Sequence, residues 1–409
     1  MKKRIILGVL ALCLMLTACG GSNSGGFDDG EPMPGFDAQN KYLISSGMNF
    51  QETDTFFFGG GRASSFHYLY YYDKASGISD VLCRDPACGH DSNACSAYVG
   101  IGEGSATWYD GAIYWVARTH DGNDYDEYLW RDDLSGAGRE KVKRISREDV
   151  VLVYQPQWYT IHRGKLYCLG RANAVTETGT GHRTTLLSAP LDDFEEFTVL
   201  YDYTFGGGTE PTVRFVGNSI YLSMVSWQWD ENDVLHETVT ITKIDCATGE
   251  SEVIYEESGI TLGIGGMWVT EQGEIYMSQW GDGDGGSVWK IESGKRTEVF
   301  SWEGDDSYVK LMDGIAANFT AEKTENGDRI RYVDIKNYAG ETLYSGELFP
   351  NGIPGISAVP GNWSFAVAGG DAEKIIFNLT DDDSQVRTSY MVMVEFGTMK
   401  PTVLWSREY

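Results

Sequence analysis

Three cysteines and one histidine occur within thirteen residues in the first quarter of the chain. They follow the spacing C-x4-C-x-H-x4-C and are Cys83, Cys88, His90 and Cys95. Three thiolates and one imidazole match the ligand set of a closed, tetrahedral structural zinc site. A proline and a glycine inside the motif allow the backbone to turn tightly around an ion. The motif therefore predicts a structural zinc centre with these four residues as its ligands.

The same cysteines allow a second interpretation, because an exported domain is expected to oxidise its thiols. Without Cys13 and Cys19, five cysteines remain in the chain: the three of the motif, Cys168 and Cys246. Five is an odd number, so they cannot all pair with one another. In one alternative the motif thiols bind a metal, while Cys168 and Cys246 form a disulfide or stay as buried thiols. In a second, two motif thiols form a disulfide and one is left over; a reactive thiol is the third. The residues alone leave these alternatives open.

Other segments offer weaker chemistry. The acidic loops 121–126 and 282–285 collect oxygen ligands of the kind that Ca²⁺ prefers, but they lack the complete calcium-binding loop pattern, so solvated turns are the simpler interpretation. Trp227 and Trp229 lie in a polar, turn-bounded stretch and are the candidate ligand-binding pair, able to stack on a sugar or a peptide; packing at a strand edge is the alternative. No phosphate-binding loop, serine-hydrolase elbow or zinc-protease motif occurs, and no catalytic residue is assigned.

The N-terminus carries a targeting signal. Residues 2–4 are basic, residues 5–16 are apolar, and Leu16-Thr17-Ala18-Cys19 follows. The apolar run is too short to span a bilayer and is left out of the fold. Small residues directly before a cysteine resemble the lipobox of bacterial lipoproteins; in that family the peptide is cut before the cysteine, which then carries the lipids. An ordinary secretory peptide, with Cys19 a bystander, is the alternative.

This resemblance implies a signal peptide over residues 1–18, lipidation at Cys19 and an extracytoplasmic protein held to the cell membrane by its lipid. Residues 19–40 are rich in Gly, Ser, Asp and Pro and lack a hydrophobic pattern, which is typical of a flexible linker. The folded domain is expected over residues 41–409. No other apolar run approaches the length of a membrane-spanning helix.

A repeat of about 54 residues organises this domain. A turn containing glycine precedes a short apolar strand at residues 110–115, 163–168, 216–222 and 272–277. From Ile113 to Leu166, Ile220 and Ile275 the steps are 53, 54 and 55 residues. A long, nearly fixed period indicates a repeat architecture. Each copy is followed by further strand-like runs, so one unit reads as four short antiparallel strands. The tyrosine of each copy is expected to pack between neighbouring units.

A single four-stranded sheet of this size cannot bury both of its faces, whereas sheets stacked radially bury them against each other. Weaker copies at 55–72, 315–333 and 374–394 bring the total to about seven units. The sequence therefore predicts an all-β protein, a β-propeller of about seven four-stranded blades. A pair of β-sandwiches would leave the period unexplained. Ring closure requires the first strand, near residues 42–44, to join the last blade, or the reverse.

Two segments together resemble a known group of proteins. Tyr70-Tyr71-Tyr72-Asp73-Lys74 with Gly77, followed by the Cys/His motif, is similar to a run found in β-propeller lipoproteins of Gram-positive, Clostridia-type bacteria. The resemblance covers the lipobox and residues 65–98, and the rest of the chain only by its repeat pattern. It implies a cell-surface propeller and no particular reaction.

The net charge of the mature chain limits the classes of partner that it could bind. With the three basic residues of the signal peptide removed from the total of 32, the mature chain has 29 basic residues against 60 acidic ones, a formal charge of −31. Nucleic acid is excluded as a partner, because phosphate binding needs clustered Lys and Arg. The favoured function is a non-catalytic surface module that binds a protein, peptide or glycan. The alternative is a propeller enzyme acting on extracellular carbohydrate, which would need two carboxylates facing each other in the central funnel.

Overall fold

A computed structural model describes most of the residues after position 31. The described residues are 32–42, 50–63, 66–83, 85–100, 106–121, 124–134, 139–145, 155–176, 179–192, 197–205, 207–209, 211–232, 234–260, 263–280, 285–304, 308–323, 329–356, 363–381 and 387–408. The predicted signal peptide, Cys19 and the first part of the predicted linker lie outside them. The compact unit begins at Pro32, so residues 32–40, assigned to the linker from the sequence, belong to it.

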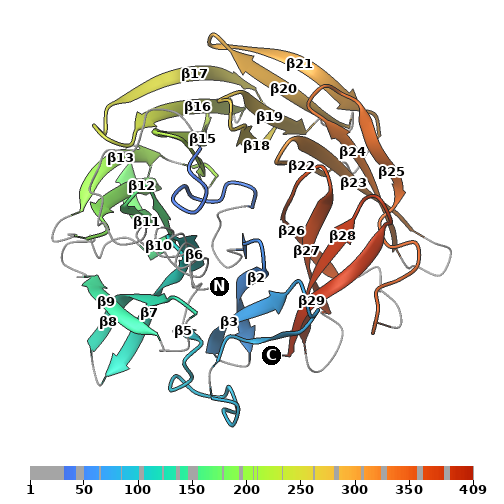
Figure 1. The fold of residues 1–409 in the computed structure, drawn as a ribbon. Helices are drawn as coiled ribbons and strands as arrows, with labels where there is room; N and C mark the ends of the chain where they lie inside the picture. Colours follow the sequence, from blue (N-terminus) through green and yellow to red (C-terminus); the bar gives the residue numbers. More distant parts are fainter. Residues whose placement is uncertain are drawn as a thin grey trace, which may run out of the picture. The chain divides into compact units, whose positions relative to one another are not determined.

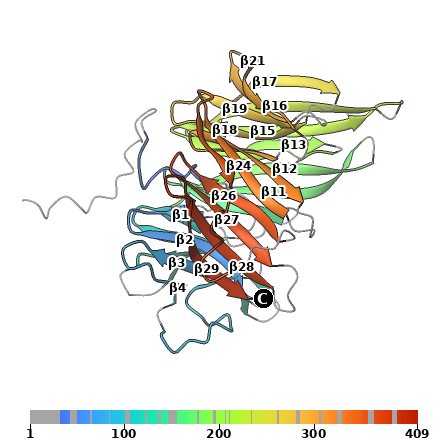
Figure 2. The ribbon, with the colours of Figure 1, turned by 90° about the vertical axis from the view of Figure 1, so that its right-hand side faces the viewer.

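Seven antiparallel sheets stand around a common axis, and each is built from strands that are consecutive in the chain (Figure 1; Figure 2 shows them from the side). The predicted all-β propeller of seven four-stranded blades is confirmed. In the part of the chain that is described, no helix is long and apolar enough to cross a membrane.

The first three blades come from the N-terminal half. Blade 1 contains β1 (Phe50–Glu52), β2 (Phe56–Ala63), β3 (Phe66–Asp73) and β4 (Ser79–Val81), with β5 (Tyr98–Gly100) also paired to β3. Blade 2 contains β6 (Ala106–Tyr109), β7 (Ala112–Asp121), β8 (Asp124–Asp132) and β9 (Glu140–Ile145). Blade 3 contains β10 (Gln155–His162), β11 (Lys165–Thr176), β12 (Gly179–Pro190) and β13 (Thr198–Phe205).

Four more blades complete the ring. Blade 4 contains β14 (Thr212–Val216), β15 (Ser219–Trp229), β16 (Leu235–Asp245) and β17 (Ser251–Ile260). Blade 5 contains β18 (Ile264–Val269), β19 (Ile275–Trp280), β20 (Gly286–Glu292) and β21 (Lys295–Trp302). Blade 6 contains β22 (Tyr308–Met312), β23 (Ile315–Lys323), β24 (Arg329–Asn337) and β25 (Thr342–Glu347). Blade 7 contains β26 (Ser364–Gly370), β27 (Lys374–Asp381), β28 (Thr388–Glu395) and β29 (Lys400–Glu408).

The glycine turns of the repeat join the first and second strands of a blade. Asp110 and Gly111 have φ angles of 45° and 73°, and Arg163 and Gly164 have 47° and 73°. Two successive positive φ angles define the type I′ turn, whose twist matches that of the flanking strands. Glycine at the second position is therefore what keeps these hairpins tight.

One tyrosine of the repeat lies in each of four successive interfaces between blades. These residues are Tyr114, Tyr167, Tyr221 and Tyr276, and all four are buried. Tyr276, for example, stacks on Tyr338 of the next blade with 3.9 Å between ring centroids. The prediction that these rings pack from unit to unit is confirmed.

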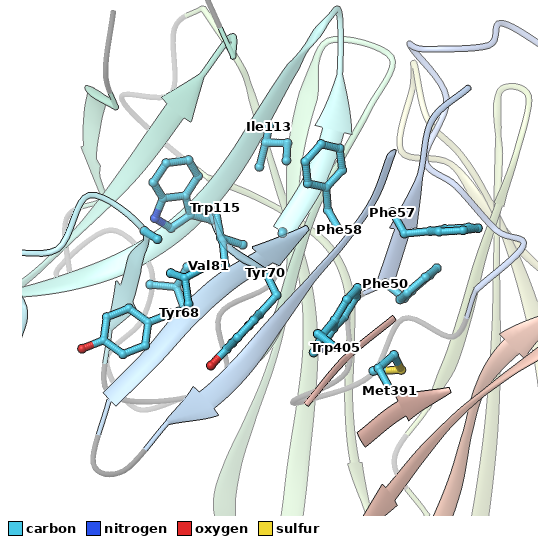
Figure 3. Packing of buried hydrophobic residues seen from close by; sticks show 14 of the residues in the cluster. Phe50, Phe57, Phe58, Tyr68, Tyr70, Val81, Ile113, Trp115, Met391 and Trp405 are labelled. Carbon is cyan, nitrogen blue, oxygen red and sulfur yellow. The ribbon is translucent and has the colours of Figure 1, made fainter. Parts of the chain in front are cut away.

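The ring closes between blades 7 and 1 by side-chain packing. Trp405 of β29 stacks on Phe50 and on Tyr70 of blade 1, with ring centroids 5.7 Å and 6.2 Å apart, as Figure 3 shows. In the part of the chain that the structure describes, both blades are made of their own consecutive strands, and no complete strand is exchanged between them. Part of the expectation survives, because Tyr42 forms a single antiparallel bridge with Gly369 of the last blade. Residues 43 and 44 lie outside the described part.

Residues 32–42, which we call the strap, cross the middle of the ring in the view of Figure 1 and lie toward one end of the blades in Figure 2. The strap bonds to turns or strands of blades 1, 2, 3, 4 and 7. Its residues have neither the alternating nor the helical pattern of apolar side chains, so these contacts could not be expected from the sequence.

Candidate metal centre

The Cys/His motif lies on an excursion that interrupts the outermost strand of blade 1. β4 pairs with the C-terminal part of β3, and β5 pairs with its N-terminal part. Between them, Leu82 donates its N–H to the carbonyl of Leu69 at 2.8 Å, and Leu69 donates its own N–H to the carbonyl of Ala97 at 2.9 Å. One residue of β3 thus fixes both ends of the excursion, so its four metal-ligand candidates are held at the edge of a rigid sheet.

The four side chains converge. The ligand atoms of Cys83, Cys88, His90 and Cys95 all lie within 4.8 Å of one another. His90 Nδ1 is 3.4 Å from Cys95 Sγ. Zinc–sulfur bonds of about 2.3 Å in a tetrahedron give ligand separations of about 3.8 Å, so a small contraction brings the group to bonding distance. The cluster is close enough to hold a metal ion.

Local hydrogen bonds shape the excursion. The Asp85 carboxylate accepts the N–H of Ala87 at 2.9 Å, and the Asp85 carbonyl accepts the N–H of Cys88 at 3.0 Å. His90 has a φ of 49°, a left-handed conformation that turns the backbone toward the cluster. The Tyr68 hydroxyl of β3 donates to the Ser92 carbonyl at 3.2 Å. These bonds help to fold the excursion into a compact loop.

The thiols sit in an environment that favours a cation among them. Burial raises the pKa of Cys95 to about 12, and the neighbouring Cys83 adds to this effect. At Cys83 burial also opposes the thiolate, but hydrogen bonds, led by the one from the Ser96 hydroxyl at 3.3 Å, outweigh it and lower the pKa to about 7. Because thiolates this close repel each other, a positive charge among them would favour the ionised forms of Cys83 and Cys95.

Arg139, which comes from blade 2, stands next to the centre. Its guanidinium donates from Nη1 to the Tyr98 carbonyl at 3.0 Å and lies 4.6 Å from the ring centroid of Trp130. Burial lowers the pKa of Arg139, while the nearby Cys95 and Cys83 thiols raise it. A metal bound by three thiolates and one neutral imidazole carries a net negative charge, which this guanidinium would balance. Arg139 could not be assigned to the centre from the sequence, because Tyr98 lies more than forty residues away from it.

The structure does not favour the disulfide interpretations. None of the five cysteines forms a disulfide, and each carries a thiol. Cys168 packs in the cluster between blades 2 and 3, whereas Cys246 packs between blades 3 and 4, so the two lie on opposite faces of one blade. Of the alternatives for this pair, buried thiols agree with the structure.

Trp227 and Trp229 end the second strand of blade 4. The two residues are two positions apart on β15, so their side chains lie on the same face of the sheet. Trp227 covers Gly207, where a Cβ atom would lie 2.0 Å from its Nε1 atom, whereas the Trp229 side chain is 65 % exposed. Trp280 is the last residue of β19, the second strand of blade 5. Its side chain covers Gly265, as that of Trp227 covers Gly207, and Trp280 is 46 % exposed. Trp280 was not predicted from the sequence, although its place after a repeat strand was the available signal.

The acidic loops proposed for Ca²⁺ cannot be placed. Residues 122–123 and 281–284 lie outside the described part, as do the remaining side chains of the first loop. Calcium binding there stays a prediction.

Acidic side chains near the strap are paired with cations. Glu52 lies 2.8 Å from Lys74 Nζ and 2.9 Å from Lys374 Nζ. Burial opposes its ionisation, but hydrogen bonds from Lys74, Tyr42 and Lys374 outweigh this and lower the pKa of Glu52 to about 2. Asp371 pairs with Lys41. These carboxylates therefore serve as ion-pair partners.

Asp313 differs from them. It lies in the turn between the first two strands of blade 6, and burial raises its pKa, with Glu271 adding to the shift. The pKa of Asp313 is thus shifted in the opposite direction to that of Glu52.

Comparison with known proteins identifies the fold and no family. No protein-family model and no curated protein matches the chain. Among solved structures, a prolyl endopeptidase is similar with a TM-score of 0.53 at 13 % identity over 90 % of this chain and 51 % of that chain. A puromycin hydrolase is similar with a TM-score of 0.51 at 13 % identity over 93 % of this chain and 57 % of that chain. The protein thus spans about half the length of these enzymes.

An ulvan lyase, described as a new polysaccharide lyase family, is similar over 92 % of this chain and 94 % of that chain, with a TM-score of 0.47 at 12 % identity. At such low identity, the two structures with TM-scores above 0.5 show a shared fold and nothing more, so no activity transfers to this chain.

Proposed function

We propose that this protein is a lipid-anchored, extracytoplasmic β-propeller that binds a protein, peptide or glycan and catalyses no reaction. The observation that carries the proposal is the pair of exposed indoles, Trp229 and Trp280, which end equivalent strands of neighbouring blades. Exposed tryptophan presents a large apolar surface with a polar handle, and such surfaces are typical of contact sites.

The binding role is tested with the full-length protein in detergent, probed against arrays of peptides and oligosaccharides. We expect the double variant Trp229→Ala/Trp280→Ala to lose at least tenfold in affinity for any ligand that the wild type binds. The matched control is Leu343→Ala, which removes an exposed apolar side chain from the outer strand of blade 6. Equal affinity of the double variant and the wild type for every ligand found would contradict the proposal.

A second candidate, an enzyme acting on extracellular carbohydrate, is supported by Asp313. A carboxyl group whose pKa is raised by burial and by the nearby Glu271 is better suited to donate a proton to a leaving group than an ion-paired one. The test is product formation from the oligosaccharides of the same array. Turnover that Asp313→Asn abolishes, while binding persists, would replace the binding role by catalysis.

We also propose that Cys83, Cys88, His90 and Cys95 hold a structural Zn²⁺. The closed set of three thiols and an imidazole supports it, because such a set leaves no open position for a substrate. Protein purified without chelator is expected to contain one zinc per chain, and Cys95→Ser to contain less than a tenth of that. Cys246→Ser, which removes a thiol outside the cluster, keeps the metal. Zinc-free wild type with a mass that shows oxidised thiols would overturn the assignment.

Anchoring rests on Cys19 and on the similarity of its surroundings to a lipobox. The full-length protein is expected in the membrane fraction, and Cys19→Ala in the soluble fraction, because two or more acyl chains suffice for stable anchoring. A Cys19→Ala protein that stays with the membrane would contradict the lipid anchor.

A further inference from the structure

The strap bonds to the turns that join first and second strands. The N–H of Asp110, in the turn of blade 2, donates to the Gly35 carbonyl at 2.7 Å. The N–H of Arg163, in the turn of blade 3, donates to the Phe36 carbonyl at 2.8 Å. These are backbone bonds to the tight turns of the repeat, so the N-terminal part of the strap is fixed at one end of the blades.

Its middle part is fixed to blades 3 and 4. Ala38 donates its N–H to His162 Nδ1 at 3.0 Å, and His162 Nε2 in turn lies 2.7 Å from the Gly217 carbonyl in the first turn of blade 4. The N–H of Phe215 donates to the Asn40 side chain at 3.0 Å. Because His162 is fully buried, this series of bonds is shielded from water.

Its C-terminal part reaches the junction of blades 1 and 7. Lys41 pairs with Glu52 at 3.2 Å and with Asp371 in the first turn of blade 7. Tyr42 bridges to Gly369 and donates its hydroxyl to Glu52. The strap thus spans the ring along one face of the propeller.

Antiparallel topology defines that face. Turns between first and second strands lie at one end of every blade, and hairpins between second and third strands lie at the other. The strap therefore marks one face, and Trp229 and Trp280, at the outer ends of second strands, mark the opposite one.

We propose that the strap face is apposed to the membrane and that the face with Trp229 and Trp280 points away from it. This orientation rests on the proposed lipid anchor at Cys19. From Cys19 to Pro32 there are 13 peptide steps, which reach at most about 45 Å when fully extended. The longest strands, β11 and β12, have 12 residues, so the opposite face lies up to about 40 Å away. If the opposite face were turned to the membrane, residues 19–32 would have to be almost fully extended over the distance between the two faces. They could not also pass around a blade.

The partner of the strap face is thus a lipid headgroup surface held near it by covalent attachment. A mature chain with a formal charge of −31 is repelled by anionic lipid, so the anchor, and not charge, sets this orientation.

Energy transfer from the protein to the vesicle surface tests the orientation. The full-length lipidated protein is placed in phosphatidylcholine vesicles that carry an acceptor dye on a headgroup. A fluorescent amino acid is introduced either at Asp54, an exposed position in the first turn of blade 1, or at Asn232, an exposed position in the β15–β16 hairpin. We expect at least twofold higher transfer from position 54 than from position 232.

Equal transfer from the two positions, or higher transfer from position 232, overturns the orientation while leaving the anchor intact. The control is Cys19→Ala with the same labels, which is expected to show no transfer from either position. If the unaltered protein also shows none, the anchor fails, and the orientation fails with it.

Discussion

Arg163 and Asp37 form a two-point ion pair across 126 residues of sequence. Arg163 Nε lies 2.6 Å from Asp37 Oδ1, and its Nη2 lies 3.2 Å from Oδ2. The third nitrogen, Nη1, donates to the Asn218 side chain of blade 4 at 2.7 Å. A bidentate pair of this kind fixes orientation as well as distance. Arg163 therefore joins the strap to two neighbouring blades through one buried guanidinium.

Replacing Asp37 is expected to destabilise the fold. In Asp37→Ala the guanidinium of Arg163, only 5 % exposed, loses its charge partner, which we expect to lower the free energy of unfolding by about 3 kcal/mol. The matched control is Asp202→Ala, which breaks the exposed pair between Asp202 and Arg183 and is expected to cost less than about 1 kcal/mol. Chemical denaturation measures both. Equal losses would mean that the strap contributes no more than a surface pair.

The buried His162 predicts a pH dependence of stability. Burial lowers its pKa from 6.5 to about 4, so the folded protein excludes a proton that the unfolded protein binds between these values. The free energy of unfolding should therefore be fully retained above pH 6.5, fall as the pH drops toward 4, and level off below it. Between pH 7 and pH 5 the loss is about 2 kcal/mol.

His162→Gln should flatten the stability curve in this range. The control His236→Gln alters an exposed histidine and should keep the slope of the wild type. The low pKa of Glu52, about 2, affects stability only below about pH 4.5, outside the measured window. Denaturation curves at pH 7, 6 and 5 give the free energy of unfolding of the wild type and both variants. A wild type whose stability is constant over this range would contradict the role of His162.

The blades could be predicted from the sequence because their signals are local. A glycine turn such as Arg163-Gly164 and the apolar run after it lie within a few residues, and repetition exposes the pattern. The Cys/His centre could be predicted for the same reason, since its ligands span thirteen residues. The strap could not, because its bonds are single polar contacts that no periodicity records. Most of them reach residues about 75 to 330 positions away, and those to Glu52 span 10 to 13 positions.

The variant Gly369→Ala tests how closely the strap must approach blade 7. Its φ is 149°, and a Cβ atom there would lie 2.8 Å from the Tyr42 Cα and 2.9 Å from the Lys41 carbonyl oxygen. Gly369→Ala must displace backbone, which is expected to cost about 2–4 kcal/mol. Gly314→Ala is the control, because Gly314 has a φ of 72° with nothing within 4 Å of its Cβ position, so it isolates backbone strain of about 1 kcal/mol. Similar melting temperatures for the two variants would argue against a close fit at Tyr42.

Arg139 is expected to tune metal affinity without binding the metal. Arg139→Gln removes the cation beside the thiolates and should weaken zinc binding by about 10–100-fold. Lys141→Gln is the control, since Lys141 lies over the same Trp130 ring, 5.3 Å from its centroid, and is exposed. Competition with a chromophoric chelator measures both affinities, and Arg139→Lys should restore part of the loss. If Arg139→Gln and Lys141→Gln bind zinc equally well, Arg139 only packs against blade 2.

Removing the metal should release the excursion before it unfolds the propeller. Both ends of the excursion are fixed on Leu69, whereas Cys88 and His90 lie at its partly exposed tip, so their fixed positions depend on the ion. A strong chelator is expected to expose residues 83–96 to limited proteolysis and to raise their amide hydrogen exchange at least tenfold, while β11 and β12 keep their protection. Cys95→Ser should show the same pattern without chelator and no further change with it. Loss of protection throughout the blades would instead mean that the ion stabilises the whole ring. If the excursion resists protease after the metal is removed, its own hydrogen bonds are enough to keep it folded.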